Sequence, residues 1–304
     1  MIFLIPISSA SQIFQKIENP KWLEEIKKNN GFSVADYDRD GDLDIFIVAF
    51  GIEDPNDPAS FSKLLRNNND GSFTDVTFES GLINLFTNLD DAKGTLAQQG
   101  YKFGASWGDY NNDGFPDLLL TYSLKIQLWL NLGNGSFENV TESSGILTSN
   151  NCINTGATWF DYNNDGYLDF YVNDWNYCGS NFIYKNNGDG TFTDLTSELN
   201  LIETESNYSY TALPFDLNDD GWLDIIVSND LHYANYAYIN NNGLSFTESA
   251  ISYGMDSIID DMGIAVSDFD NDNDFVADAP TSSAVADGVT FELDASLSGA
   301  EVPL

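Results

Sequence analysis

Asp36-Tyr-Asp38-Arg-Asp40-Gly41-Asp42-Leu-Asp44 is the first copy of a nine-residue pattern that recurs along the chain. Positions 1, 3, 5 and 9 of the pattern hold aspartate or asparagine, and position 6 holds glycine. Three further intact copies occupy residues 109–117, 161–169 and 216–224. Glycine at that place permits the backbone conformation that a sharp turn needs. The pattern therefore predicts four equivalent tight loops.

The loops carry the ligand set of a hard divalent cation. Ca²⁺ takes about six to eight oxygen ligands from carboxylates, amides and backbone carbonyls. Without a cation, two like charges about 4 Å apart repel by about 4 kcal/mol at an effective dielectric of about 20. Acidic surface turns that bind nothing are therefore the weaker interpretation. With the backbone carbonyl at position 7, the predicted calcium ligands are Asp36, Asp38, Asp40, Asp42, Asp44, Asp109, Asn111, Asp113, Phe115, Asp117, Asp161, Asn163, Asp165, Tyr167, Asp169, Asp216, Asn218, Asp220, Trp222 and Asp224.

A fifth copy is altered. It keeps Asp268, Asp270 and Asp272, whereas Asn273 replaces the glycine and Val276 replaces the last aspartate. Because one carboxylate ligand is lost, we expect a weak fifth site or none.

The loops are not EF-hands. An EF-hand ends with a glutamate at position 12 and lies between two helices. Here position 12 is apolar, and short runs rich in aliphatic and aromatic residues follow each loop, which indicates strands. The predicted strands after the loops are Leu43–Val48, Leu118–Tyr122, Leu168–Val172 and Leu223–Val227, and strands such as Gly104–Gly108 and Gly156–Phe160 precede them.

A second signature completes the repeat. An Asn-Gly or Asp-Gly turn between alternating apolar residues is a hairpin signal, and it recurs within residues 65–77, 129–141, 184–196 and, in a looser form, 238–246. Each repeat thus has four antiparallel strands, the content of one propeller blade. The aromatic residues at equivalent places should pack in the core between blades: Phe73, Phe137, Phe192, Phe246, Trp107 and Trp159.

The spacing of the copies predicts the architecture. Their first residues lie at 36, 109, 161, 216 and 268, so the intervals are 73, 52, 55 and 52 residues. A period near fifty indicates an all-β propeller of four-stranded antiparallel blades, with four full repeats and partial terminal ones. The long first interval places an insertion within 82–101, and Pro20–Lys28 is the best candidate for a short helix. We expect repeats over residues 11–276.

Composition limits the partners. The 304 residues include 48 Asp and Glu against 11 Lys and Arg, for a net charge of −37. Such a surface repels nucleic acids and acidic membranes. No apolar run reaches the about eighteen residues of a transmembrane span. Nucleic-acid binding and a membrane span are therefore not expected.

Two further features indicate an extracellular protein. Cys152 and Cys178 flank the third loop, and we expect a disulfide, which fits an oxidising compartment; two free thiols are the alternative. Residues 1–10 resemble the apolar core and cleavage site of a signal peptide, although the positive start is missing and a first strand stays open. Residues 277–304 form a tail that resembles the first strands of an immunoglobulin-like PKD domain.

The loop, the Gly-Ala-Ser-Trp-Gly-Asp-Tyr stretch at 104–110 and the hairpin at 186–196 together resemble FG-GAP/VCBS repeats. The nearest subgroup is the cartilage-acidic-protein-like secreted proteins. The resemblance spans residues 12–274. It implies an integrin-α-like β-propeller, usually of about seven blades, with calcium in the loops. The altered fifth loop, the small number of repeats and the unfamiliar C-terminus leave ring closure open. One alternative is a circular closure in which N- and C-terminal strands share a blade, and the other is a fragment of a longer ring.

Three functions compete. The first is a calcium-binding scaffold, secreted or at the cell surface, for adhesion or protein recognition. The second is a carbohydrate-binding propeller, which clustered exposed aromatic residues beside Asn and Asp would support. The third is an enzyme that cleaves polysaccharides or phospholipids. The chain has one histidine, His232, and lacks a Gly-x-Ser-x-Gly elbow and a Gly-rich phosphate loop, so we expect no enzyme. The partner, protein or glycan, is not identified by the sequence.

Overall fold

The computed structural model describes residues 29–49, 60–82, 102–123, 125–146, 152–175, 179–201, 208–256, 258–259 and 262–264. These residues form four four-stranded antiparallel sheets, which confirms the all-β prediction. Several predicted segments lie outside the described residues. They are the helix at Pro20–Lys28, the insertion apart from Leu82, the altered fifth copy and both terminal segments, 1–10 and 277–304.

Each sheet is one repeat. The first contains β1 (Asn29–Ala35), β2 (Asp44–Ala49), β3 (Lys63–Asn67) and β4 (Phe73–Asp75), and the second contains β5 (Lys102–Gly108), β6 (Asp117–Tyr122), β7 (Ile126–Asn131) and β8 (Phe137–Asn139). The third contains β9 (Asn154–Phe160), β10 (Asp169–Asp174), β11 (Phe182–Asn186) and β12 (Phe192–Asp194). The fourth contains β13 (Ser209–Phe215), β14 (Asp224–Asn229), β16 (Tyr236–Asn240) and β17 (Phe246–Glu248), followed by the 3-10 helix η4 (Ala250–Tyr253). A short pair joins β15 (Tyr233–Ala234) to β18 (Ile258–Ile259).

The second strand of each sheet lies deepest in the fold. All six residues are buried in β2, β6, β10 and β14. This is why the run after each loop is apolar without alternation, since both faces of the strand are covered. The fourth strands β4, β8, β12 and β17 have three residues each, two of them exposed. Such short edges limit pairing with other chains.

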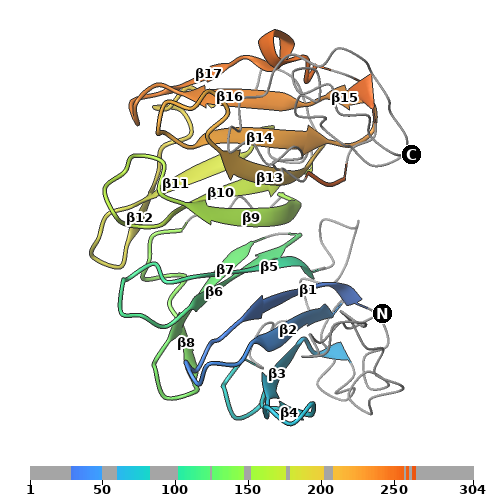
Figure 1. The fold of residues 1–304 in the computed structure, drawn as a ribbon, viewed down its shortest axis with the longest axis vertical. Coiled ribbons are helices and arrows are strands. Elements are labelled where there is room, and N and C mark those ends of the chain that lie inside the picture. The colour runs from blue at the N-terminus through green and yellow to red at the C-terminus, as the bar shows by residue number, and fades with distance from the viewer. Residues whose placement is uncertain are drawn as a thin grey trace, which may run out of the picture.

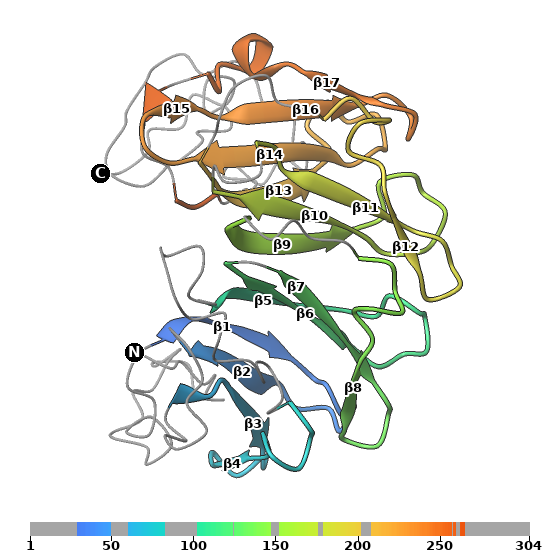
Figure 2. The ribbon, with the colours of Figure 1, turned by 180° about the vertical axis from the view of Figure 1, so that it is seen from behind.

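The sheets stack in an open row (Figures 1 and 2). Their first strands are neighbours in space, so that β5 lies between β1 and β9, and β9 lies between β5 and β13. Within each sheet the strands then follow in chain order from the first strand to the outer edge. The four described sheets do not close into a ring.

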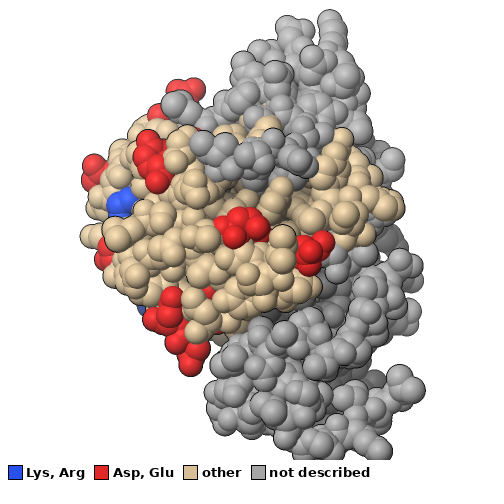
Figure 3. Space-filling model, turned by 90° about the horizontal axis from the view of Figure 1, so that it is seen from above, with Lys and Arg blue, Asp and Glu red and all other residues tan. Residues whose placement is uncertain are grey.

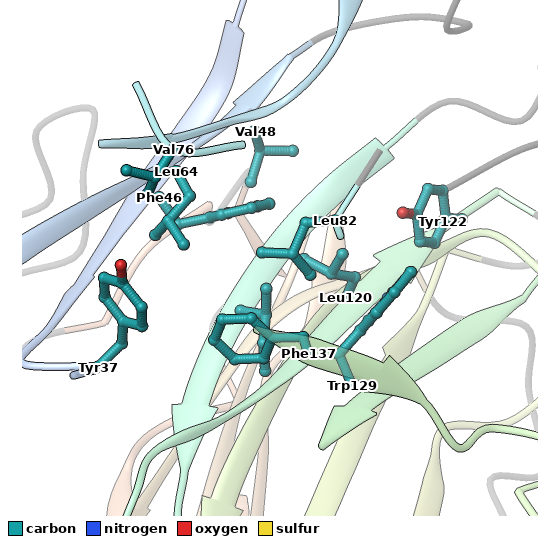
Figure 4. Close-up of a cluster of buried hydrophobic side chains, with 11 residues drawn as sticks. Tyr37, Phe46, Val48, Leu64, Val76, Leu82, Leu120, Tyr122, Trp129 and Phe137 are labelled. Carbon is teal, nitrogen blue, oxygen red and sulfur yellow. The ribbon is translucent and has the colours of Figure 1, made fainter. Parts of the chain in front are cut away.

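Aromatic side chains fill the space between neighbouring sheets. Phe137 lies 5.8 Å from Tyr37 between ring centroids, and Trp107 stacks on Tyr37 at 6.5 Å. Trp159 and Phe192 contact Tyr110 in the same way at the next interface. Figure 4 shows the first of these clusters, in which Phe46 and Leu64 of one sheet face Leu120 of the next. The prediction that the repeated aromatic residues form the core is thereby confirmed at these interfaces.

One buried asparagine in each later repeat joins two sheets. The side-chain amide of Asn131, at the end of β7, donates to the carbonyl of Tyr37 in the preceding repeat (2.8 Å) and to that of Pro116 in its own (3.0 Å). Asn186 bonds Tyr110 and Leu168 equivalently. Asn240 repeats the arrangement with Tyr162 and Leu223. In the first repeat, Asn67 bonds Leu43 of its own loop and is less buried.

These bonds give a stability prediction. Asn186→Ala should destabilise the chain by about 2–4 kcal/mol, because each buried carbonyl left without a donor costs about 1–3 kcal/mol. Asn67→Ala removes the same side chain from the end of the row and should cost about 1 kcal/mol or less. Urea unfolding of both variants checks this. Equal losses for the two variants would contradict an inter-sheet role.

Candidate metal centres in the repeat loops

The four nine-residue loops share one backbone conformation. The residue at position 4 is left-handed in all of them, with φ of 61° at Arg39, 58° at Asn112, 55° at Asn164 and 56° at Asp219. The glycine at position 6 has φ between 85° and 96° in all four loops. Residues with a side chain rarely adopt the φ that these four glycines have. The structure thus confirms the predicted sharp turn.

The carboxylates at positions 1 and 5 are turned inward by backbone amides. In the second loop, Asp109 accepts hydrogen bonds from the amides of Asp113 (3.0 Å) and Gly114 (2.7 Å). The amide of Phe115 then donates to Asp113 at 2.8 Å. The third and fourth loops repeat all three bonds. The predicted ligands at these positions therefore gather around each turn instead of splaying outward.

The aspartate at position 9 connects the loop to the sheet. Asp117 is fully buried and accepts bonds from the amides of Tyr110 (3.2 Å) and Asn131 (2.7 Å). Asp44, Asp169 and Asp224 make the same pair of bonds. Burial raises the pKa of Asp117 to about 7 and that of Asp44 to about 6, and the accepted backbone bonds oppose the shift. The aspartate predicted as a ligand at position 9 thus has a structural role in the fold.

The first loop holds the densest group of carboxylates. Asp36, Asp38 and Asp40 each offer an oxygen, and these three atoms lie within 4.8 Å of one another. Oδ1 of Asp36 is buried and accepts no hydrogen bond. A buried carboxylate oxygen without a partner is costly, and three converging carboxylates are what a hard cation prefers. The residues present therefore fit a calcium ion.

The polar contacts of the later loops differ from those of the first. Position 3 is an asparagine, whose side-chain amide donates to the position-5 carboxylate at 2.9 to 3.0 Å. In the third loop, the ammonium group of Lys185 also bonds and pairs with Asp165. A cation in the third loop would share that carboxylate with a lysine.

The side chain at position 7 has a packing role that the sequence analysis did not identify. In three loops the aromatic ring there packs against a hairpin glycine of the same repeat. The ring atoms of Phe115, Tyr167 and Trp222 lie 2.9 to 3.0 Å from where a Cβ would stand on Gly133, Gly188 and Gly243. These glycines also have positive φ, between 67° and 74°, so the Asn-Gly hairpin accommodates the loop's aromatic ring.

The asparagines that join the sheets were not recognised from the sequence. Asn67, Asn131, Asn186 and Asn240 belong to the hairpin signature, where asparagine reads as a turn residue. Their backbone amides hold the position-9 aspartates, and the side chains of the last three bond the preceding repeat. The signal that could have found them is their fixed place six residues before the hairpin phenylalanine, which is Phe73, Phe137, Phe192 or Phe246.

Cys152 is buried and disulfide-bonded. The chain has one other cysteine, Cys178, which lies outside the described residues. The disulfide prediction is thereby confirmed for Cys152. No helix in the described part of the chain is long and apolar enough to cross a membrane.

Comparisons with known proteins agree with the repeat pattern. The sequence profile of FG-GAP-like repeats matches residues 36–120, 109–172, 161–227 and 216–275. Curated protein sequences give no match. Repeats of this type are typical of extracellular proteins.

Two solved structures are similar to this chain at low identity. One is an Agrocybe aegerita lectin that recognises non-reducing terminal N-acetylglucosamine, with 19% identity over 73% of this chain and 52% of that one and a TM-score of 0.41. The other is the V. cholerae biofilm matrix protein Bap1, with 14% identity over 71% and 27% and a TM-score of 0.36. The chain thus spans 52% of the first and 27% of the second. From the four matches to the profile, the chain belongs to the FG-GAP-like repeat family.

Proposed function

We propose that this chain is a calcium-binding, extracellular repeat scaffold for adhesion or protein recognition. The observation that carries the proposal is the first loop, where three carboxylate oxygens lie within 4.8 Å of one another and Asp36 Oδ1 is buried without a hydrogen bond. The other three loops share its backbone conformation, and in all four the amide of the position-6 glycine donates to the position-1 carboxylate. The proposal therefore extends to about four sites.

A bound calcium ion would supply positive charge at the centre of each loop and neutralise the converging carboxylates. The chain itself fixes the rest. Backbone amides orient the aspartates at positions 1 and 5, and the buried aspartate at position 9 ties the loop to its own sheet. On the face seen in Figure 3, acidic side chains lie at several separate places among the described residues, while basic ones are few. Such a surface gains from cations and disfavours polyanionic partners.

We also propose that the sheets are blades of a β-propeller. Support comes from the adjacency of the first strands and from the strand order within each sheet. The asparagine bonds that join each repeat to the preceding one run in a single direction. Leu217 holds the place of Tyr37, Tyr110 and Tyr162 in the fourth loop, so a further blade would continue the series there.

Carbohydrate binding is a second candidate, favoured by one aromatic cluster. Trp175 packs on Tyr208 with 5.4 Å between ring centroids, and Tyr208 packs on Tyr233 at 5.3 Å. The neighbouring Tyr210 is 39% exposed. Exposed aromatic faces with polar neighbours can stack on sugars. A glycan array should then give hits that Tyr210→Ala weakens, whereas an array without hits would reject this candidate.

We propose binding and not catalysis as the role of the scaffold. The sole histidine, His232, lies in an exposed turn with φ of 65°. Turnover of a polysaccharide or phospholipid that is abolished in His232→Ala would overturn this view.

Calcium removal should destabilise the protein. If calcium binds the folded state alone, a site at about 100 times its dissociation constant adds about 2.7 kcal/mol. Thermal unfolding with a chelator should therefore show a lowered melting temperature that added calcium restores. Calorimetry should count about four sites, near the roughly 10⁻⁴–10⁻³ M affinities of extracellular modules. An unchanged melting temperature with the chelator would reject the calcium proposal.

Lys185 should weaken the third site. Lys185→Met frees the Asp165 carboxylate, and calcium affinity at that loop should rise roughly two- to fivefold, because exposed ion pairs are worth about 0.2–1 kcal/mol. Lys63→Met is the matched control, since Lys63 pairs with Asp75 at 2.8 Å away from the loops. That control should lower stability and leave calcium affinity unchanged. Calcium titration of both variants tests this, and unchanged affinity in Lys185→Met would show that the lysine does not compete.

A further inference from the structure

The four loops are linked to one another by the side chain at position 4. The amide group of Asn112 in the second loop donates to the carbonyl of Gly166 in the third (3.0 Å). Asn164 in the third loop donates to the carbonyl of Gly221 in the fourth (3.3 Å). Between the first and second loops, Arg39 lies over the Phe115 ring, 5.4 Å from its centroid, and contacts Gly114. The position-4 side chain of each of the first three loops thus contacts the position-6 glycine of the next loop.

A second link runs in the opposite direction. The backbone amide of Asn131 holds Asp117, the position-9 carboxylate of the second loop. The side chain of the same Asn131 donates to the carbonyl of Tyr37, which is position 2 of the first loop. Asn186 and Asn240 join the later loops identically. A displacement of one loop's carboxylate therefore acts on the backbone of its neighbour.

Both kinds of link involve residues next to the proposed ligands in the chain. Position 4 lies between the ligands at positions 3 and 5, and the glycine carbonyl that it holds precedes position 7. A loop that becomes ordered around a cation fixes its position-4 side chain, which in turn orders the following loop. We propose that neighbouring loops bind calcium with positive cooperativity through these contacts, an inference that rests on the calcium-binding function proposed above. Such coupling is reciprocal, so occupancy of either loop favours the other.

The test removes the position-4 side chains without straining the backbone. Glycine adopts positive φ readily, so the double variant Asn112→Gly/Asn164→Gly keeps the turns and deletes both bonds. Calcium titration of the native chain should give a Hill coefficient above one. Because the Arg39 contact and the asparagine links of the third strands remain in the variant, it should bind the same number of ions with a lower Hill coefficient than the native chain. Its midpoint affinity should be weaker by roughly two- to tenfold, as expected for the loss of single hydrogen bonds.

Asp219→Gly is the matched control. Asp219 holds position 4 of the fourth loop with φ of 56°, and no bond joins it to a following loop within the described residues. Its substitution should leave the Hill coefficient unchanged. As a readout without calcium, hydrogen exchange of the amide of Gly166 in the metal-free protein should be faster in Asn112→Gly and unchanged in Asp219→Gly.

The outcomes separate this inference from the function on which it rests. A native chain that binds no calcium rejects the proposed function and the cooperativity with it. Calcium binding with a native Hill coefficient of one or below, or with a coefficient that the double variant does not change, rejects the coupling alone. A native coefficient above one that falls in the double variant and persists in Asp219→Gly supports the coupling.

Discussion

The interaction on which the structure depends is the bond between a buried aspartate and a buried asparagine. The aspartate ends the nine-residue loop, and the asparagine ends the third strand of the same sheet, as Asp117 and Asn131 do at 2.7 Å. Because that asparagine also donates to the preceding repeat, one residue closes the loop, orients the hairpin and joins two sheets. Removing a partner would leave buried polar groups unpaired, which is the costly case for hydrogen bonds.

Those bonds explain why the loops lie at one edge of the stack. Each loop connects the first strand of a sheet to the buried second strand, and the first strands of successive sheets are neighbours. The loops must then follow one another along the row, close enough for Asn112 and Asn164 to reach the next glycine. The proposed metal centres are therefore a consequence of the repeat stacking as much as of the local pattern.

Much of the fold could be predicted from the sequence, because a local pattern that recurs four times in register supports the same assignment each time. The loops, the strands after them and the aromatic residues between sheets follow from glycine, periodicity and equivalent position. The role of Asn131 and its equivalents could not be predicted, because it depends on contacts such as that with Tyr37, 94 residues away. For the same reason, the packing of the Tyr167 ring against Gly188 could not be predicted from the loop pattern alone.

The position-9 aspartate connects the packing of the core with the proposed calcium ion. Burial raises the pKa of Asp117 to about 7, because an ionised carboxylate in the core lacks its full hydration. A nearby cation would favour the ionised form, so the loop's charge and the core's packing would be satisfied together. The aromatic cluster of Trp175 and Tyr208 lies at the other strand ends, since Trp175 follows β10 and Tyr208 precedes β13. If calcium makes the loop edge rigid, as proposed, the opposite edge with its aromatic cluster is held in a fixed position, which fits the proposed recognition role.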